Sequence, residues 1–416
     1  MTGGIRFQGA HLTIDGHAAA DLAESHGTPL YLYSGEVMAA ACRQIGEAFP
    51  GGVRICYAVK ANGLRAILRF LAEEGCGFDL VSGGEMVRLE AAGLGACERV
   101  FDGVGKEAWE VERAMSRPGL LFLNLESLAE AEMLARVGRR LGRPVPVALR
   151  LTLEIAAGSH VYLNTSLGRE KFGLAPEEAL EAARLAAVSP WLEPVGCHLH
   201  LGSLLADPEP YLEAIRRALE FADRAGLDLR FLDIGGGFAP SLAHGGQAFP
   251  FDRLGPPLAG LLAGRETELV VEPGRFLVGP AGLLLTRVIR VKERGRRRFL
   301  IVDGAMNDFI RPSLYGGEHL VWPVASGPPP VGEIPAGRTD VTGPVCESGD
   351  FLARDRALPD LAAGDLLALF CAGAYGSAMA SRYNSRRLPA EVILAGGEPR
   401  LARQRDDFSD LWEREL

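Results

Sequence analysis

The sequence lacks the features that mark membrane, secreted and nucleic-acid-binding proteins. No apolar run is long enough for a membrane helix, and the N-terminus, MTGGIRFQGAHL, lacks the basic-then-apolar layout of a signal peptide. The seven cysteines are an odd number with no Cys-x-x-Cys pair, which argues against a disulfide framework or a zinc site. The formal net charge of −9 argues against nucleic acid or an anionic membrane as the main partner. We therefore expect a cytoplasmic protein.

What the sequence does contain is a regular alternation of short apolar runs with helical patterns. Eight runs predict strands, at residues 53–59, 77–81, 99–102, 120–124, 145–151, 194–200, 230–235 and 268–274. They are almost continuously apolar, as strands buried on both faces of a parallel sheet are. Helical patterns separate most of them, for example at residues 126–142, 175–188 and 208–226. Eight such units predict an α/β fold, a (β/α)8 TIM barrel.

The pattern changes after about residue 280. Strand-like runs at residues 282–293, 297–304, 317–324, 365–374 and 390–397 follow one another with no strong helix between most of them. They predict a C-terminal, mainly β domain resembling a sandwich or barrel. The N-terminal segment at residues 4–16 alternates like a strand and is assigned to the same domain. The predicted domains are therefore residues 28–278 for the barrel, and residues 1–27 and 279–416 for the β domain.

Polar residues gather where the predicted barrel strands end. The active site of a TIM barrel lies at the carboxyl ends of its strands. A single polar residue after a strand is common because every strand must reach solvent, so their convergence at one end is the informative feature. These strand ends carry Lys60, Asp79, Ser82, Asp102, Asn124, Arg150, His198, His200, Gly235, Gly236, Gly237, Glu272 and Arg275.

Lys60 follows the first of these strands, in YAVKAN. Taken alone it could be a surface lysine with a partly buried stem. The alternative is a Schiff-base lysine, because desolvation lowers the pKa of an amine and a neutral amine attacks an aldehyde.

Three consecutive glycines, Gly235, Gly236 and Gly237, follow a later strand in DIGGGF. Taken alone they could form a flexible turn, but they also leave backbone N–H groups free to approach an anion. Their spacing differs from the dinucleotide fingerprint, and no P-loop Lys-Ser/Thr follows. A cofactor phosphate therefore fits better than a nucleoside triphosphate.

Two further strand ends carry groups suited to a flat, aromatic cofactor. Glu272 in VVEPGR is either a structural ion-pair partner or the carboxylate that keeps a pyridine nitrogen protonated. Arg275 could serve a phosphate or a substrate carboxylate. In GCHLHLGS, His198 and His200 lie two residues apart, yet no further ligand stands at metal spacing. We interpret His198 as a planar group stacked on a cofactor ring.

The β domain contributes an unusual pair, Cys346 beside Glu347. A buried, inert cysteine is the common case. Beside a carboxylate, a thiol tends to stay protonated, which suits a proton donor better than a thiolate nucleophile. Lysine, glycine triplet, strand-end glutamate and stacking histidine together predict pyridoxal 5′-phosphate.

At this point the residues resemble a known family, diaminopimelate decarboxylase. The matching motifs run in family order over residues 28–393, nearly the whole chain. They are YAVKAN, FDLVSGGE, KFG, GCHLHLGS, LDIGGGF, EPGRFLV, GAMNDFIRPSLYGGEH, GPVCESGDFLARDRALP and CAGAYGSAMASRYNSR. The resemblance implies the alanine-racemase fold, which ornithine decarboxylase shares, and homodimers whose active sites lie at the subunit interface. It also implies the reaction, decarboxylation of meso-2,6-diaminopimelate to L-lysine and CO2.

The resemblance also implies roles for individual residues around the cofactor. Lys60 would be the Schiff-base lysine, Glu272 would face the pyridine nitrogen, and His198 would stack on the ring. The other residues expected to bind the cofactor are Asp79, Ser203, Gly235, Gly236, Gly237, Gly274, Arg275 and Tyr375.

On the substrate side, the resemblance assigns Arg311 and Tyr315 to the distal carboxylate and Glu347 to the distal amino group. Cys346 would reach across from the partner subunit to protonate the α-carbon. Arg275 and Tyr375 would contact the substrate as well as the cofactor.

One segment departs from the family pattern. Residues 158–173 read GSHVYLNTSLGREKFG where the family carries a stretch of the form STG…KFG. Because this loop shapes the substrate side of the pocket, the exact substrate stays open. The alternatives are a related decarboxylase acting on a D-amino acid, ornithine, lysine or carboxynorspermidine, an amino-acid racemase, and a non-catalytic cofactor carrier.

Overall fold

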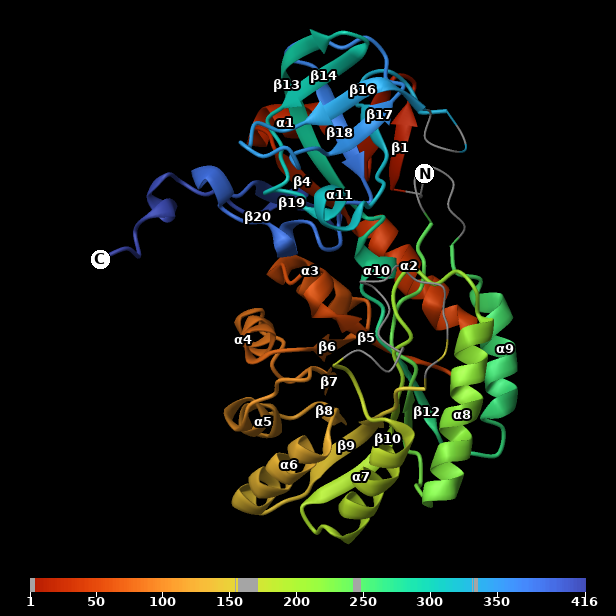
Figure 1. Ribbon diagram of the computed structural model, residues 1–416. Helices are drawn as coiled ribbons and strands as arrows, with labels where there is room; N and C mark the ends of the chain where they lie inside the picture. The colour runs from red at the N-terminus through yellow and green to blue at the C-terminus, as the bar shows by residue number, and fades with distance from the viewer. Residues whose placement is uncertain (1–3, 154, 156–170, 242–247, 331, 333–335) are drawn as a thin grey trace. The chain divides into compact units, whose positions relative to one another are not determined.

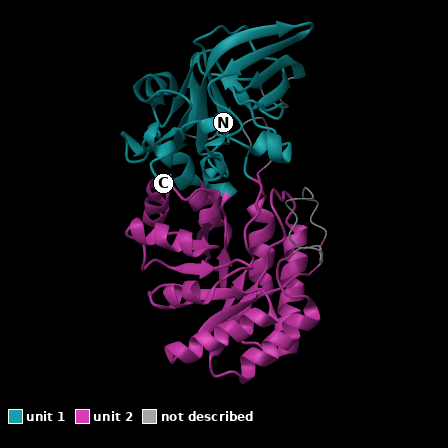
Figure 2. Ribbon diagram, turned by 60° about the vertical axis from the view of Figure 1, so that its left-hand side comes forward, with its two compact units in different colours: residues 1–40, 240–247, 275–416 teal, residues 41–239, 248–274 magenta. Residues whose placement is uncertain are grey.

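The computed structural model describes residues 4–153, 155, 171–241, 248–330, 332 and 336–416 (Figure 1). The chain divides into two compact units (Figure 2). The barrel unit comprises residues 41–239 and 248–274, and the β unit comprises residues 1–40, 240–247 and 275–416. No helix among the described residues has both the length and the apolar character needed to cross a membrane.

The barrel unit is built on eight parallel strands that close on themselves in sequence order. They are β5 (Arg54–Ala58), β6 (Gly77–Leu80), β7 (Arg99–Phe101), β8 (Leu120–Leu125), β9 (Val145–Arg150), β10 (Leu192–His198), β11 (Phe231–Asp233) and β12 (Glu268–Val271). Each coincides with one of the eight predicted runs, so the predicted TIM barrel is confirmed. The runs are apolar because the barrel interior and the surrounding helices bury both faces of each strand.

Helices follow most of the strands and lie outside them (Figure 1). They are α3 (Arg65–Glu73), α4 (Gly83–Ala91), α5 (Ala108–Met115), α6 (Leu128–Leu141), α7 (Pro176–Val188), α8 (Glu209–Ala225) and α9 (Phe251–Leu261), with a 3-10 turn η1 (Val59–Ala61) after β5. Side-chain caps fix where two of them begin. Ser82 and Ser127 accept backbone N–H groups at the starts of α4 and α6.

A layer of apolar side chains fills the barrel interior. It consists of Cys56, Val100, Phe122, Ala148, Val195, Phe231 and Val270, one from each strand except β6. The rings of Phe122 and Phe231 lie 5.2 Å apart between centroids. This packed layer holds the strands rigidly, so the side chains beyond their carboxyl ends have fixed positions.

The β unit is built on a sheet of nine strands, which confirms the predicted mainly β domain. The main path runs β17-β16-β14-β13-β4-β19-β20, and β18 pairs with both β13 and β15. The strands are β4 (Leu30–Ser34), β13 (Gly282–Arg294), β14 (Arg297–Val302), β15 (Val321–Pro323), β16 (Ala336–Thr342), β17 (Ala353–Arg356), β18 (Leu366–Phe370), β19 (Ala390–Leu394) and β20 (Pro399–Arg403). Short helices are α10 (Arg275–Val278), α11 (Arg311–Tyr315), η3 (Ser377–Met379), η4 (Tyr383–Ser385) and η5 (Ser409–Leu411).

The N-terminal segment forms a small sheet of its own within the β unit. Strands β1 (Ile5–Gln8), β2 (His11–Ile14) and β3 (His17–Ala18) pair in order, and helix α1 (Ala19–His26) follows. Two backbone bonds, Leu12 N–H to Val324 and Gly327 N–H to Ala10, connect it to the rest of the unit.

The observed division differs from the predicted boundaries mainly at residues 28–40, and also at residues 240–247 and 275–278. The sequence pattern places them with the barrel, whereas they group with the β unit. For residues 28–40 the reason is strand β4, which pairs with β13 and β19. The division falls within helix α2 (Gly35–Ala48).

Candidate active site

Lys60 and Asp79 form an ion pair at the carboxyl ends of β5 and β6. Nζ of Lys60 donates to Oδ2 of Asp79 at 2.6 Å. The Asp79 side chain is fully buried, whereas a third of the lysine side chain is exposed. Burial raises the pKa of Asp79 to about 7, although the Lys60 charge acts to lower it. Oδ2 of Asp79 therefore lies within hydrogen-bond reach of the Lys60 amine.

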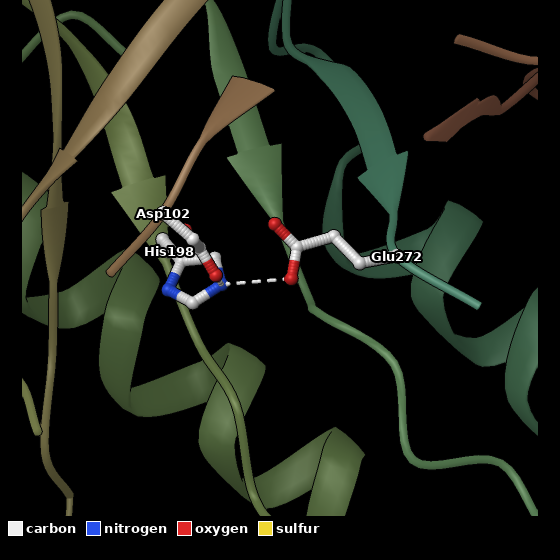
Figure 3. A group of neighbouring side chains, drawn as sticks. All are labelled: Asp102, His198 and Glu272. Atoms are coloured by element: carbon white, nitrogen blue, oxygen red, sulfur yellow. Dashed lines mark hydrogen bonds and ion pairs between the residues drawn. The ribbon is translucent and has the colours of Figure 1, made fainter. Parts of the chain in front are cut away.

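His198 and Glu272 face each other across the same end of the barrel (Figure 3). Nε2 of His198, at the end of β10, lies 3.3 Å from Oε2 of Glu272, which follows β12. Both side chains are buried. Burial raises the pKa of Glu272 well above its usual range, and the charges of Asp102 and Asp79 raise it further. A side-chain hydrogen bond with Asp233 acts in the opposite direction and lowers the pKa of Glu272.

Asp102 is the third member of this group. Its Oδ2 lies 3.9 Å from Nε2 of His198. Its Oδ1 accepts a hydrogen bond from the side-chain amide of Asn124 at the end of β8. Burial acts to raise the pKa of Asp102, but the positive charges of His198, Arg150 and Lys60 outweigh it and hold that pKa well below its usual range.

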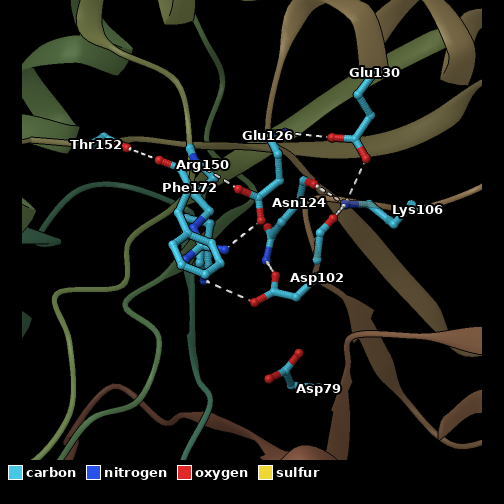
Figure 4. Close-up of polar contacts among 12 residues, drawn as sticks. Asp79, Asp102, Lys106, Asn124, Glu126, Glu130, Arg150, Thr152 and Phe172 are labelled. Carbon is cyan, nitrogen blue, oxygen red and sulfur yellow. Dashed lines mark hydrogen bonds and ion pairs between the residues drawn. The ribbon is translucent and has the colours of Figure 1, made fainter. Parts of the chain in front are cut away.

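A second set of buried charges lies behind Asp102 (Figure 4). Nζ of Lys106 pairs with Oε1 of Glu130 at 2.8 Å and donates to the carbonyl oxygens of Gly103 at 2.6 Å and Asn124 at 2.8 Å. The lysine side chain is completely buried. All three ammonium protons therefore have acceptors, which is the condition for burying a lysine.

Glu126 fixes Arg150 at the end of β9. Nη1 of Arg150 donates to Oε1 of Glu126 at 2.6 Å, and both side chains are buried. Oε2 of Glu126 accepts the backbone N–H of Gly173 at 2.8 Å. The guanidinium lies over the ring of Phe172, 4.8 Å from its centroid. Residues 171–173 of the divergent segment are thus anchored to the strand ends, while its residues 158–170 lie outside the described part of the chain.

The glycine triplet is held in one shape rather than being a flexible turn. Oδ1 of Asp233 accepts the N–H of Gly235 at 2.8 Å, and the carbonyl of Gly235 accepts the N–H of Glu272 at 2.8 Å. Tyr211 donates to the carbonyl of Gly236 at 2.6 Å. A Cβ on Gly236 would overlap the carbonyl oxygen of Glu272, so the close approach requires glycine.

His200 and the loop that contains Ser203 border this triplet. The N–H of Gly236 points to Nδ1 of His200 at 3.4 Å, and burial holds the pKa of His200 well below its usual range. The N–H of Leu205, two residues after Ser203, donates to the carbonyl of Gly237 at 2.9 Å. Two chain segments therefore meet at the triplet.

Gly274, the last residue of the barrel unit, packs closely on the segment that carries Lys60. A Cβ at this position would lie 3.0 Å from the Cβ of Ala61 and 3.2 Å from that of Ala58. The smallness of all three residues keeps the two strand ends close together.

The β unit brings four of the predicted residues together. The guanidinium of Arg275 lies 4.7 Å from the ring centroid of Tyr375, and that of Arg311 lies 5.4 Å from the ring of Tyr315 and 6.0 Å from that of Tyr375. Tyr375 has a φ of 55°, a left-handed conformation that is rare for a tyrosine. Burial lowers the pKa of Arg311 to about 10, with a contribution from Arg275. Two neighbouring cations favour a carboxylate or phosphate ligand.

Cys346 and Glu347 lie on a fixed loop of the β unit with both side chains exposed. The N–H of Cys346 donates to Oδ1 of Asn384 at 2.9 Å, and the N–H of Val345 donates to Asp350 at 2.7 Å. The loop therefore presents the thiol and the carboxylate outward.

The sequence did not single out Lys106, Glu126, Glu130 or Asp233. Asp233 stands two residues before the first glycine of the triplet in LDIGGG, and Ser127 with Glu130 matches an S-x-x-E helix start, so the sequence contains a signal for Asp233 and for Glu130. Lys106 lies in a loop, and nothing in the neighbouring sequence predicts that its side chain is buried.

The barrel end fits pyridoxal 5′-phosphate. Glu272 offers a buried carboxyl that could face a pyridine nitrogen, and His198 offers a buried planar ring beside it. The glycine triplet packs closely against the backbone carbonyls of Leu199, Gly202 and Glu272, which its lack of side chains allows. Lys60 supplies the amine.

Comparison with known proteins points the same way. A family described as pyridoxal-dependent decarboxylase, pyridoxal binding domain, matches residues 36–279. Diaminopimelate decarboxylase of Neisseria meningitidis serogroup B is 41% identical over 407 residues, covering 95% of this chain and 94% of the relative. That of Pseudomonas aeruginosa is 41% identical over 421 residues, covering 98% of each. The crystal structure of the Helicobacter pylori diaminopimelate decarboxylase complexed with L-lysine has a TM-score of 0.87 at 39% identity, covering 95% of this chain and 98% of that one.

Proposed function

The chain belongs to the diaminopimelate decarboxylases, which are pyridoxal-dependent, and from that premise we propose that it converts meso-2,6-diaminopimelate into L-lysine and CO2 in lysine biosynthesis. One observation carries the proposal on the chemical side. Lys60 is hydrogen-bonded to the buried carboxyl group of Asp79, beside the buried pair of His198 and Glu272. Such a set has no evident structural purpose.

The barrel residues would hold the cofactor and move one proton. Lys60 would hold it through Nζ, Glu272 would face its ring nitrogen, and His198 would lie on its ring. Oδ2 of Asp79, 2.6 Å from Nζ, would accept the proton that Nζ must lose before the amine acts as a nucleophile. When bound, pyridoxal phosphate supplies an electron sink for the charge left by a departing CO2.

The remaining cofactor contacts are proposed to surround its phosphate and edge. They are made by Asp79, Ser203, Gly235, Gly236, Gly237, Gly274, Arg275 and Tyr375.

Residues of the β unit would bind the substrate and protonate its α-carbon after decarboxylation. We assign its distal carboxylate to Arg311 and Tyr315, because a buried guanidinium whose Nε has no hydrogen-bond partner among the described residues favours an anionic ligand. Arg275 and Tyr375 would also contact the substrate, and Glu347 would take its distal amino group. Cys346 would donate the thiol proton to the α-carbon after CO2 leaves.

We propose a cytoplasmic homodimer in which each subunit lends Cys346 and Glu347 to the other's site. The exposure of both side chains on a fixed loop supports the shared site. All seven cysteines are free, which supports a reducing compartment. Mixing a Lys60→Ala variant with a Cys346→Ala variant should restore about a quarter of wild-type activity, because a mixed dimer has one intact site. No recovery after subunit exchange would rule out the shared site.

The function is tested by a decarboxylation screen with CO2 detection. We expect turnover of meso-2,6-diaminopimelate and little of L-lysine or L-ornithine, which lack the distal carboxylate. Lys60→Ala should lose both turnover and the visible absorbance of the lysine-bound cofactor, while Lys292→Ala on the exposed face of β13 should keep both. Preference for lysine or ornithine would instead identify a related decarboxylase, and racemisation without CO2 release would identify a racemase.

A further inference from the structure

Asp102 is a buried carboxylate to which the proposed function gives no role. It follows β7, is 4% exposed, and lies among the strand-end residues of the site. Its Oδ2 lies 3.9 Å from Nε2 of His198, the same ring nitrogen that lies 3.3 Å from Oε2 of Glu272 (Figure 3). One ring nitrogen of His198 therefore faces two acidic side chains.

Asp102 is held in place from two directions (Figure 4). The fully buried amide of Asn124 donates to its Oδ1. Nζ of Lys106 donates to the carbonyl of Asn124 and to that of Gly103, the residue after Asp102. The backbone on both sides of the Asn124–Asp102 contact is thus fixed by one buried ammonium.

The two carboxylates differ in what else they can do. Glu272 also forms a side-chain hydrogen bond with Asp233, and in the proposed function it serves the ring nitrogen of the cofactor. Asp102 has Asn124 on one oxygen and His198 beside the other, so it can serve only the histidine. The charged and titratable groups around His198 come from β7, β9, β11, β12 and the end of β10, and they are Asp102, Arg150, Asp233, Glu272 and His200.

We propose that Asp102, held by Asn124 and Lys106, is a positioning residue that fixes the plane of the His198 imidazole against the cofactor ring. This rests on the proposed function, in which His198 contacts that ring. A histidine held only by Glu272 would lose its partner whenever Glu272 turns to the cofactor. Asp102 removes that dependence, because its charge stays beside Nε2 throughout.

The test uses the complete protein saturated with pyridoxal phosphate. The readout is the visible circular dichroism per mole of bound cofactor, which reports how the ring sits in the site and does not respond to loss of stability at full occupancy. Asp102→Ala should change this spectrum and lower kcat/KM about 10-fold to 100-fold. Asp102→Asn, which keeps an acceptor for Asn124 but loses the charge, should show a smaller change and remains informative if the alanine variant does not fold.

A double-mutant cycle tests the supporting contact. Asn124→Leu should reproduce part of the Asp102→Ala change, and the double variant should be no worse than Asp102→Ala alone, because both act through one carboxylate. Additive effects would overturn the proposed chain of contacts.

The matched control is Glu391→Gln in the β unit. Glu391 is a buried carboxylate that accepts a hydrogen bond from Tyr33 at 2.6 Å. Its replacement should lower thermal stability without changing the cofactor spectrum. His198→Asn separates the two hypotheses. If it changes the spectrum and Asp102→Ala does not, the positioning role of Asp102 is wrong and the function stands. If neither changes it, the ring contact of His198 fails and the positioning role of Asp102 fails with it, whereas the decarboxylation itself is decided by the CO2 screen.

Discussion

Replacing Lys106 by methionine tests whether the buried charges behind the site act as one unit. Methionine preserves most of the side-chain volume but removes the ammonium. It leaves the Glu130 carboxylate, with 9% of its side chain exposed, without its cation. Breaking a buried ion pair by removing one partner costs about 3–5 kcal/mol. Two carbonyl oxygens also lose their donor, so we expect unfolding to become easier by about 4–5 kcal/mol.

Adding Glu130→Gln to Lys106→Met should restore much of the lost stability. In Lys106→Met/Glu130→Gln no buried charge is left unpaired, and the glutamine oxygen can still accept the N–H of Glu126. Only the lost carbonyl hydrogen bonds remain, about 2 kcal/mol. Glu130→Gln alone leaves the ammonium unpaired and should cost about 3 kcal/mol. The double variant is therefore expected to be more stable than Lys106→Met.

The stability that Lys106→Met loses relative to the wild type should become smaller as the pH falls. Burial already raises the pKa of Glu130, even though Lys106 opposes the shift. Without Lys106, the carboxyl can shed its charge by taking a proton, and it does so more readily as pH falls. The deficit of Lys106→Met should shrink between about pH 8 and about pH 5.

Urea unfolding followed by far-ultraviolet circular dichroism gives these values for all four proteins, at matched cofactor occupancy. A Lys106→Met protein as stable as the wild type would refute the reasoning. So would a double variant whose loss equals the sum of the two single losses, because independent sites add and a shared ion pair does not.

Three further predictions concern the glycine triplet, the stability of the β unit and substrate binding. Gly236→Ala should lower the affinity for pyridoxal phosphate about tenfold, because the added Cβ would displace the Glu272 carbonyl. Gly260→Ala is the control, because a Cβ there meets open space and should leave the affinity unchanged. Equilibrium dialysis measures the affinity of both variants. Burial raises the pKa of Asp308 to about 7, so its contribution to stability is full below about pH 4 and is lost as pH rises through 7. Asp308→Asn should flatten that part of the stability profile in urea titrations, and an unchanged profile would contradict the assignment. Arg311→Lys should raise the KM for meso-2,6-diaminopimelate about tenfold in a CO2-release assay, because lysine cannot bind a carboxylate with two parallel hydrogen bonds; an unchanged KM would remove Arg311 from the substrate site.

The barrel could be predicted from the sequence because its signal is local. Each strand is a short apolar run, and the closed order of strands follows the order of the chain. The site inherits this property, since the carboxyl ends of parallel strands meet. Lys60, His198 and Glu272 were therefore identifiable as strand-end residues from their neighbours in the sequence.

The sheet of the β unit could be predicted only in part. Strand β4 reads as one more apolar run, and its partners β13 and β19 stand hundreds of residues away, so nothing nearby shows where it pairs. Strands β17 and β20, ARDR and PRLAR, are rich in arginine and lack an apolar pattern. The buried pair of Lys106 and Glu130 was missed for a related reason. A charge is normally a sign of exposure, and only the tertiary structure supplies the partners that allow its burial.

The pairing of β4 also sets an order of events during synthesis. This strand leaves the ribosome before the whole barrel sequence, yet its neighbours begin at Gly282 and Ala390. At typical elongation rates, β4 has open edges on both sides for on the order of tens of seconds. The barrel sequence can fold during that interval, whereas the β unit cannot complete its sheet until nearly the last residues are made. A nascent chain truncated before β19 should therefore carry a finished barrel and an unfinished sheet, and β4 would be its point of misassembly.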